Sequence, residues 1–547
     1  MGRNNSPTKN RWNFSLAGVR FLIIILLAIG VFFRFANLEK KVYWSDEAIT
    51  SLRLSGYTQA EVVQQVLTGK VIKNEDLNKY RRINLEKSLG DTINSLAVED
   101  YQHPPLYYVI ARFWVQWFSN LVAATRQLSA LISLFAFPCI YWLCLELFES
   151  GLVGWIAIAL IAVSPFHVVY AQEAREYSLW TVTILLSSAS LLRAIRLKTK
   201  FSWGIYAATV ALGLYSFPLS GLVAIGHGIY TAVIEKFRLS KVSAAYLLSS
   251  LAGFLLYTPW ILVGLINLQQ VDKTLGWTAE KLPLLSLVST WTINFSRIFV
   301  DFLDAGSYFP NLKLPSFPLE RYNISLPSIL FLSLLILVIY SIYFLCRYTP
   351  KKTWLFVLTL MGTTGLALIL PDLISGGQRS SVSRYAIPSY LGIQLAVGYL
   401  LATKISFLSA NLWKQKLWQF ITVLLLSGGV FSCSISSQAS AWWNKYGDYY
   451  NPWIAHFINQ TTYPLVISSS NAVDIGRVLS LSYLLAPEVQ LQLVVDSKIP
   501  EIPNNFNNRF LFNFPEASQE ELEKEYKIEP VQELRRFKSK LLRIERH

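Results

Sequence analysis

The sequence predicts an α-helical protein that crosses a membrane many times and carries a small α/β domain at its C-terminal end. The first observation is composition: 53% of the 547 residues are hydrophobic, 15% are charged and the mean hydropathy is +0.38, which is too apolar for a soluble globular chain of this length. The second is a series of long apolar segments separated by short basic clusters. The third is a rise in polar residues after about residue 438.

The basic residues lie mainly in short clusters next to apolar segments, as at residues 193–200, and give a formal net charge of +15. This placement follows the positive-inside rule and argues against a nucleic-acid partner. The cysteines lie in or beside apolar segments, so they imply neither a disulfide framework nor a metal cluster: Cys139, Cys144, Cys346 and Cys433. These patterns require no cofactor; a divalent metal is possible but not indicated.

The apolar run 21–33 follows basic residues and lacks a small-residue cleavage site before residue 46, so we expect an uncleaved first helix with a cytoplasmic N-terminus. The polar stretch 40–103 is long enough to form an external loop, in which residues 61–67 and 80–87 are expected to form short juxtamembrane helices. The apolar part of 104–118 is about fifteen residues, or roughly 22 Å as a helix, which is short of a ~30 Å hydrocarbon core. We expect that this helix does not cross the membrane.

Later apolar segments are expected to cross it, at 121–148, 151–169, 178–198, 202–217, 219–234, 242–268, 326–346, 353–371, 385–403 and 417–436. With the first helix they make about eleven crossings and put every basic short loop in the cytoplasm. We therefore expect a multi-pass protein of the plasma (inner) membrane with a transmembrane domain over residues 1–437. An external soluble α/β domain would follow over residues 438–547, with strands at 464–470, 489–496 and 508–514 and helices at 474–486 and 518–526.

Two adjacent acids, Asp46 and Glu47, follow the first apolar segment within the stretch VYWSDEAIT at residues 42–50. A carboxylate near the water interface can stay ionised and still face a reactant held in the membrane. This makes the pair a candidate for a catalytic base. The alternative interpretation is a solvated pair that favours the start of a short helix through its dipole.

Two further segments fall on the same external side. His103 precedes two prolines that fix the chain at the start of helix 104–118, and the alternative is helix punctuation with an interfacial histidine. Residues 164–177 place charged and polar side chains between two apolar spans. Such side chains are costly there unless they line an aqueous cavity or pair with one another.

The external stretch 376–385 carries Arg379 and Arg384 together with several serines. Arginine on the outer side runs against the charge bias of membrane proteins. At the outer end of a span it can bind an anion such as a lipid phosphate, or it can snorkel to headgroups. The density of arginine and serine in one short loop favours an anion site.

These segments fit one reaction if the substrate is a sugar attached through phosphate to a long membrane lipid. Its transfer needs a base that takes a proton from an acceptor hydroxyl or amine, for which we choose Asp46. It also needs cations that stabilise the departing phosphate, for which we choose Arg175 and Arg384. Because phosphate is a weak base, no general acid is required, unlike in the two-carboxylate glycosidases.

The order of these motifs resembles the superfamily of protein O-mannosyltransferases and lipid A aminoarabinose transferases. The matching stretches are the acid pair after the first helix, HPPLYY from residue 103, SPFHVVYAQEAREYSLW from residue 164 and SRYAIPSY from residue 383. The resemblance implies a GT-C fold glycosyltransferase that uses a polyprenyl-phosphate sugar, with undecaprenyl phosphate as the carrier in a bacterial host. It implies Asp46 as the catalytic acidic residue with Glu47 beside it.

The candidate residues at the donor phosphate and lipid are Arg175, Tyr177, Arg379, Arg384 and Tyr385, and those at the cavity edge are His103, His167, Tyr170 and Glu173. The expected partners are the lipid-linked donor, membrane lipids and an acceptor that is a lipid, a glycan or a protein. The alternative function is a flippase or transporter of lipid-linked sugars, which would carry polar residues deep inside several spans. A non-catalytic scaffold whose tail binds a partner is the third hypothesis.

Overall fold

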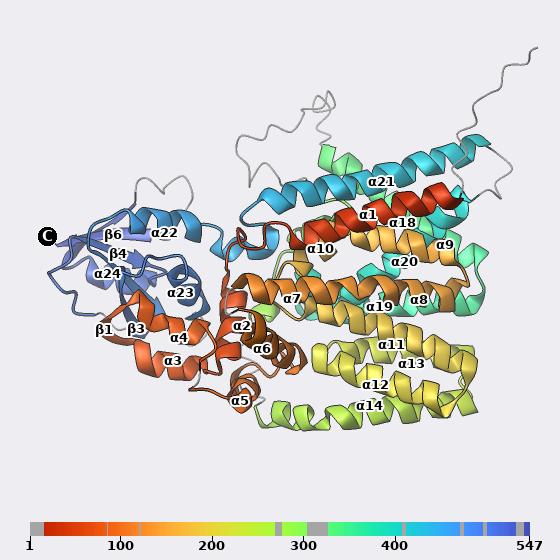
Figure 1. Cartoon of the computed structure of the whole chain (residues 1–547), viewed down its shortest axis with the longest axis horizontal. Helices are drawn as coiled ribbons and strands as arrows, with labels where there is room; N and C mark the ends of the chain where they lie inside the picture. The colour runs from red at the N-terminus through yellow and green to blue at the C-terminus, as the bar shows by residue number, and fades with distance from the viewer. Residues whose placement is uncertain are drawn as a thin grey trace, which may run out of the picture.

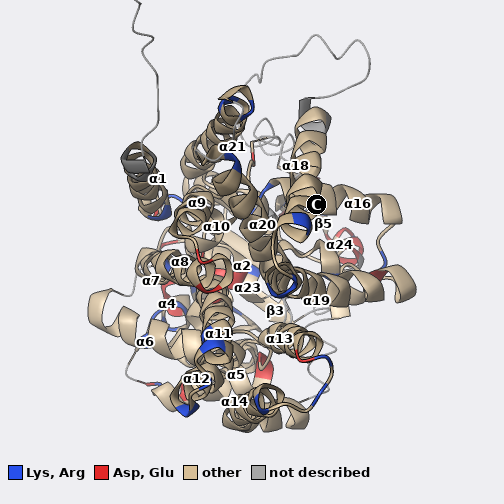
Figure 2. Cartoon of the chain, turned by 90° about the vertical axis from the view of Figure 1, so that its right-hand side faces the viewer, with Lys and Arg blue, Asp and Glu red and all other residues tan. Residues whose placement is uncertain are grey.

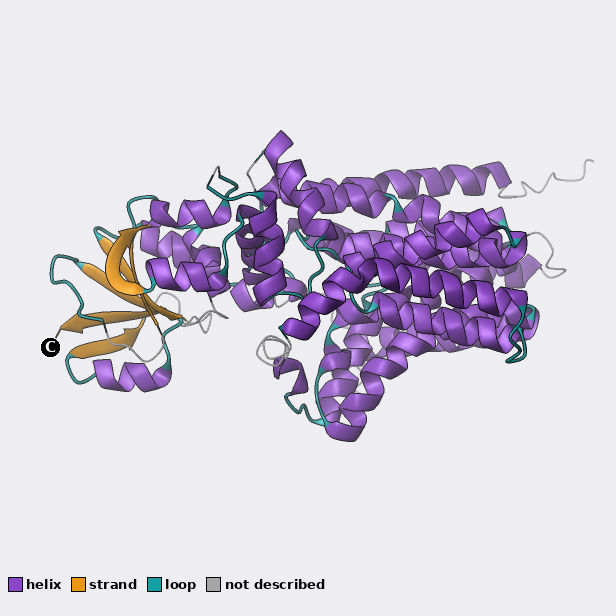
Figure 3. Cartoon of the chain, turned by 90° about the horizontal axis from the view of Figure 1, so that it is seen from below, coloured by secondary structure: helices purple, strands orange, loops and turns teal. Residues whose placement is uncertain are grey.

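The computed structural model describes residues 16–84, 86–119, 122–267, 276–302, 326–406, 412–470, 475–495, 500–531 and 541–546. Helices run side by side in a long bundle, and a six-stranded sheet lies at one end of it (Figures 1 and 3). We call this end the sheet end and the opposite end the basic end. The helices of the bundle are α1 (Leu16–Phe35), α7 (Val122–Leu134), α8 (Ala136–Phe148), α9 (Gly151–Ala162), α10 (Pro165–Ala171), α11 (Tyr177–Leu197), α12 (Lys200–Ser216), α13 (Ser220–Ile234), α14 (Lys241–Ile266), α18 (Leu326–Tyr348), α19 (Lys351–Ser375), α20 (Ile387–Ile405) and α21 (Leu412–Gln438).

Among the described residues, seven helices are long and apolar enough to cross a membrane, and an eighth is counted if the bent pair α9 and α10 forms one span. Helices α1 and α13 are apolar but shorter. Every predicted span therefore coincides with helical structure, and the chain is a multi-pass membrane protein. The number of crossings stays a prediction, as does the role of α6 (Leu106–Phe118), which covers the helix that we expected not to cross.

The helix ends that we expected to lie on the cytoplasmic side are close to one another at the basic end of the bundle. Glu146 at the end of α8 pairs with Arg196 at the end of α11 at 2.8 Å. At the same end, the Thr353 hydroxyl of α19 donates to the Leu147 carbonyl at 3.3 Å. Figure 2, seen from this side, shows Lys and Arg gathered at the helix ends. The predicted basic loops thus lie at the end opposite the sheet.

The loop after α1 folds into short elements at the sheet end: α2 (Ser45–Ser55), α3 (Gln59–Val66), β1 (Thr68–Lys73), η1 (Asn74–Leu77), α4 (Asn78–Arg81) and α5 (Leu89–Glu99). Thr58 begins α3 and Ser88 begins α5, each with a capping box that satisfies the first backbone amides. The helix predicted over residues 80–87 is wrong beyond Arg81. There the chain turns to an extended conformation at Arg82.

The tail contributes α22 (Asn451–Asn459), β2 (Pro464–Ser470), α23 (Ile475–Ser482), β3 (Gln490–Val495), β4 (Asn508–Phe512), α24 (Glu516–Leu522), β5 (Tyr526–Pro530) and β6 (Leu541–Arg546). The strand order is β1-β3-β2-β4-β6-β5, with β2 parallel to both of its neighbours and the outer pairs antiparallel. Strand β1 comes from the loop and pairs with β3, which lies more than 400 residues later in the chain, through partners such as Val71 and Gln492. The loop and the tail therefore share one sheet and one hydrophobic core.

The span predicted as continuous over residues 151–169 is bent by 61° between α9 and α10. Pro165 begins α10 and disfavours a helical residue before it, so the helix breaks there. Arg34 of α1 donates hydrogen bonds to the backbone carbonyls near the break, to that of Ile161 at 3.0 Å and to that of Ala162 at 2.7 Å. Gly30 lets α1 approach closely enough for this, because a Cβ at position 30 would overlap the Ala162 carbonyl.

We predict that Gly30→Ala lowers the stability of the protein by about 1–3 kcal/mol, the usual cost of forcing an extra carbon into a packed contact. The matched control is Gly204→Ala on α12, where nothing lies within 4 Å of an added Cβ. Alanine is the better helix former, so the control should be neutral or slightly stabilising. Thermal unfolding in detergent compares the two, and equal melting temperatures would contradict the close approach of α1 to α9.

Candidate active site

The acid pair begins α2 at the sheet end, directly after the extended residue Trp44. Both acids lie in the first turn, where the helix dipole favours negative charge. The backbone N–H of Ser45 donates to Oδ2 of Asp448 at 2.7 Å, so an acid of the tail satisfies this helix start. Successive helix residues are rotated by about 100°, and the carboxylates of Asp46 and Glu47 accordingly face different surroundings.

Glu47 is fully buried and its carboxylate is held by cations and one backbone amide. Arg126 donates to Oε1 at 2.8 Å and to Oε2 at 2.6 Å, and Lys445 donates to Oε2 at 2.7 Å. The N–H of Ala174 donates to Oε1 at 3.0 Å. Burial alone would raise the pKa of Glu47, but Arg126 and Lys445 lower it to about 2. Glu47 is thus an ionised clamp that joins α2, α7, the loop after α10 and η6 (Trp443–Asp448).

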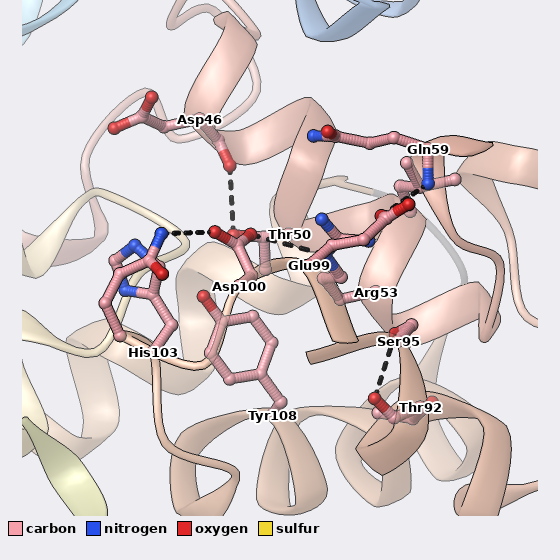
Figure 4. Close-up of polar contacts among 12 residues, drawn as sticks. Asp46, Thr50, Arg53, Gln59, Thr92, Ser95, Glu99, Asp100, His103 and Tyr108 are labelled. Atoms are coloured by element: carbon pink, nitrogen blue, oxygen red, sulfur yellow. Dashed lines mark hydrogen bonds and ion pairs between the residues drawn. The ribbon is translucent and has the colours of Figure 1, made fainter. Parts of the chain in front are cut away.

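Asp46 has a freer carboxylate, which is directed toward Arg384. Its Oδ2 lies 3.9 Å from Nη2 of Arg384, and the two side chains are 30% and 21% exposed. The Arg384 guanidinium lies 5.6 Å from the ring centroids of Tyr177 and Tyr385 and makes no hydrogen bond to any described residue. Figure 4 shows the Asp46 carboxylate turned away from Thr50, whose hydroxyl bonds the Asp46 backbone oxygen at 3.0 Å. This pair is therefore open to a third group.

Arg175 lies next to Asp46 and is buried among polar partners. Its Nη1 donates to the Thr50 hydroxyl at 3.2 Å and to the Asp46 carbonyl at 3.4 Å. Its Nη2 donates to Nε2 of His103 at 2.9 Å, and Nδ1 of His103 donates to Oε1 of Glu176 at 2.6 Å. An arginine on one ring nitrogen and a carboxylate on the other fix the orientation of the histidine ring.

Glu176 completes this chain of contacts from a fully buried position. Besides His103, it has Arg175 at 3.7 Å and the Tyr108 hydroxyl at 3.5 Å. Burial alone would raise the pKa of Glu176, but Arg175 and His103 lower it to about 2. The carboxylate is ionised and holds His103 and Arg175 in place behind Asp46.

Glu173 differs from Glu47 and Glu176 because no cation among the described residues pairs with it. Its Oε2 accepts a hydrogen bond from Asn444 at 2.8 Å, whereas its Oε1 is buried and has no partner within the described part of the chain. Burial is the main cause that raises the pKa of Glu173 to about 7, with the charge of Glu47 adding to it and Lys445 opposing it. A proton can therefore be gained or lost at this carboxyl near neutral pH.

The remaining candidates divide into two groups. Tyr170 lies with the site: its hydroxyl contacts that of Ser383 at 3.0 Å, and its ring lies 5.2 Å from that of Tyr177. His167 and Arg379 have other surroundings. His167 bonds Gln394 at 3.0 Å inside the bundle, and Arg379 pairs with Asp372 at 3.1 Å at the end of α19.

Three residues of this site were not among the candidates: Arg126, Asn444 and Lys445. Arg126 is an isolated arginine in an otherwise apolar span, and the rule that a charge inside a span marks a site could have found it. Asn444 and Lys445 lie in the tail, about 400 residues after the acid pair. No local pattern connects them to Glu47. Within the described residues, no group of three or more His, Cys, Asp and Glu side chains could hold a metal ion.

Comparison with known proteins places this arrangement in a known fold. No protein-family model and no curated protein matches the sequence. Among solved structures, ArnT from Cupriavidus metallidurans bound to undecaprenyl phosphate matches with a TM-score of 0.54 and 10% sequence identity, over 97% of this chain and 98% of that chain. The same protein in the apo state matches with a TM-score of 0.51 and 11% identity. The chain has the fold of ArnT.

The ArnT match confirms the predicted resemblance at the level of the fold, which is of the GT-C type. Because it covers nearly the whole length of both chains, it includes the helix bundle and the sheet end together. The tail is thus part of the architecture shared with ArnT.

An apolar groove runs along the ArnT-like bundle between α1, α9, α20 and α21, with a volume of about 740 Å³. It extends along α1 from Leu22 to Ile29 and along α21 from Gln419 to Ser434. Its end near Ser434 lies toward the sheet end, where Lys41 donates to the backbone carbonyl of Ser436. The groove therefore has mostly apolar walls and lies along the membrane part of the molecule.

We predict that Glu173→Gln stabilises the protein more at pH 8 than at pH 5. The pKa of Glu173 is raised in the folded state from its ordinary value of 4.5 to about 7. The wild type therefore loses stability as the pH rises through the range between these two pKa values. The whole change is at most about 3 kcal/mol. Glutamine does not titrate and can still accept from Asn444, so the variant lacks this loss.

Melting temperatures of the purified protein at the two pH values give the test, with the exposed residue Glu488 changed to Gln as the control. The melting temperature of the Glu173 variant should exceed that of the wild type by more at pH 8 than at pH 5. A difference that does not change with pH would show that Glu173 is ionised throughout this range.

Proposed function

We propose that the chain is an integral-membrane glycosyltransferase that moves a sugar from a polyprenyl-phosphate donor to an acceptor at the sheet end, which we place on the extracytoplasmic side. The observation that carries this proposal is the approach of the Asp46 carboxylate to the Arg384 guanidinium. A base and a phosphate-binding cation are the two groups that the reaction needs. Both are partly exposed, so a substrate can reach them.

Arg384 is the proposed ligand of the donor phosphate. The guanidinium is planar and presents parallel N–H groups that match two phosphate oxygens. The rings of Tyr177 and Tyr385 hold it by cation–π contacts and leave its N–H groups without protein acceptors among the described residues. The bound phosphate would make the strong charge-assisted bonds that Asp46 at 3.9 Å does not.

Asp46 is the proposed base. It would take the proton from the acceptor hydroxyl or amine as that atom attacks the anomeric carbon of the sugar and the bond to the phosphate oxygen breaks. The electron pair of that bond leaves with the phosphate, which needs no proton because it is a weak base. Phosphate bound by Arg384 would lie next to Asp46, which brings the base and the leaving group to the same donor sugar.

The remaining charged groups are proposed to position these two. Glu47 fixes the start of α2 through Arg126 and Lys445, so it acts on the direction of Asp46 and takes no proton itself. Arg175 bonds the Asp46 carbonyl and adds positive potential where phosphate charge develops. Charges held by buried partners need no rearrangement during the reaction.

The lipid part of the donor is proposed to follow the apolar groove along α1 and α21. ArnT of the same fold binds undecaprenyl phosphate, which supports a polyprenyl phosphate as the carrier. A groove of about 740 Å³ that faces the membrane provides apolar walls for part of such a chain. Its position brings one end of the chain toward the sheet end, where the phosphate must reach Arg384.

We predict that Asp46→Asn lowers sugar transfer by about 10²–10⁴-fold, the usual contribution of a general base. The melting temperature should stay within a degree or two, because the side chain is partly exposed and its ion pair is long. Transfer from a synthetic polyprenyl-phosphate sugar by the purified protein measures this. The exposed Asp76→Asn in the same loop is the matched control and should keep full activity. An active Asp46→Asn protein would contradict the proposal.

A further inference from the structure

A second polar pocket lies at the sheet end, where the loop after α1 meets the tail. Its volume is about 190 Å³, room for roughly six water molecules at about 30 Å³ each, or for one sugar ring. Its lining includes Asn74, Glu75, Asn78, Arg81, Arg82 and Tyr483. None of the residues that we assign to donor binding or proton transfer lies in this lining. We propose that the pocket binds an anionic sugar, a phosphorylated or carboxylated unit of the acceptor.

Two arginines give the pocket its preference for an anion. Arg81 is held in place by the Asn78 side-chain oxygen at 2.6 Å and donates to the Ser482 hydroxyl at 3.2 Å. Arg82 is exposed and forms no hydrogen bond or ion pair with any described residue. The exposed Glu75 also lines the pocket and offsets one of the two charges. A fixed guanidinium beside a free one can bind a phosphate or carboxylate from two sides.

Asn74 indicates that the ligand also carries a hydroxyl group. This side chain is only 4% exposed, and its Nδ2 donates to the Leu485 carbonyl at 2.8 Å. Its Oδ1 is buried and has no hydrogen-bond partner within the described part of the chain. A buried acceptor without a donor is costly, and a sugar hydroxyl would supply that donor.

Tyr483 adds an apolar face of the kind on which sugar rings stack. Its ring is 39% exposed and lies 6.0 Å from the Arg81 guanidinium. Its other neighbour is the ring of Tyr43 at 4.7 Å, so the tyrosine is braced from behind. A guanidinium pair, an unpaired acceptor and a braced aromatic ring together fit an anionic saccharide better than a bare anion.

The position of the pocket suits a unit of the acceptor that is remote from the reacting atom. Ser480, two residues before the lining residue Ser482, donates its hydroxyl to the carbonyl of Tyr43, three residues before Asp46, so the segment that borders the pocket is tied to the start of α2. Arg81 also borders a small cavity with Ser51 of α2, roughly 7.5 Å along the helix axis from Asp46. This assignment rests on the proposed function, because only a transferase has an acceptor.

The test measures binding of glucose 6-phosphate to the full chain in nanodiscs of neutral lipid, with glucose and inorganic phosphate as comparison probes. We expect glucose 6-phosphate to bind most tightly, and Arg82→Ala to weaken it at least tenfold. Arg546→Ala, at an exposed position on β6, is the matched control and should leave binding unchanged. The Asp46→Asn protein should bind like the wild type, because the pocket is separate from the base.

Three outcomes would overturn the proposal. The first is that the Arg82→Ala protein binds glucose 6-phosphate with the same affinity as the wild type. The second is inorganic phosphate binding as tightly as the sugar phosphate, which would show a simple anion site. The third is that the protein binds none of the soluble probes but binds vesicles that contain phosphatidylglycerol, and that Arg82→Ala abolishes this binding. That result would show a site for a lipid headgroup. An active Asp46→Asn protein would contradict the proposed transferase mechanism, whereas the binding of glucose 6-phosphate to the pocket would be judged by the binding measurements alone.

Discussion

The buried contact of Glu47 with Arg126 and Lys445 is the interaction on which the site depends. It joins three segments that are far apart in the sequence: the start of α2, the start of α7 and the chain after α21. A buried ion pair often contributes little net stability, but removal of one partner leaves an unpaired charge that costs about 3–5 kcal/mol. The charges therefore fix one arrangement. In that arrangement the carboxylate of the neighbouring Asp46 lies 3.9 Å from the Arg384 guanidinium.

The sequence predicted the parts of the site that carry local motifs, and the structure places Asp46, Arg175, His103 and Arg384 close together. Position does not establish role, so the assignments of base and phosphate ligand stay proposals. The ion pairs of Glu47 with Arg126 and Lys445 could not be predicted from its motif. In the sequence, an acid next to a candidate base looks the same whether its carboxylate is solvated or held in a buried ion pair. Its partner Lys445 is 398 residues away and carries no pattern of its own.

For the fold as for the site, the features that depend on local sequence patterns were predictable, and those that depend on contacts between distant segments were not. Apolar segments and basic loops fix the helices of the bundle and the end at which each loop lies, because these depend on composition near each residue. Strand β1 was missed because its six residues alternate only weakly and gain their partner from β3. The bend between α9 and α10 could have been found at Pro165, whereas its stabilisation by Arg34 depends on the packing of α1.

The central claim is that a lipid phosphate and the Asp46 carboxylate meet at the sheet end. It is tested most directly by an experimental structure of the purified protein with a polyprenyl phosphate bound. The account predicts phosphate density within hydrogen-bonding distance of the Arg384 guanidinium and beside Asp46, with the lipid chain entering the groove between α1 and α21. Phosphate density at the basic end, or at the sheet end without contact to Arg384, would contradict it.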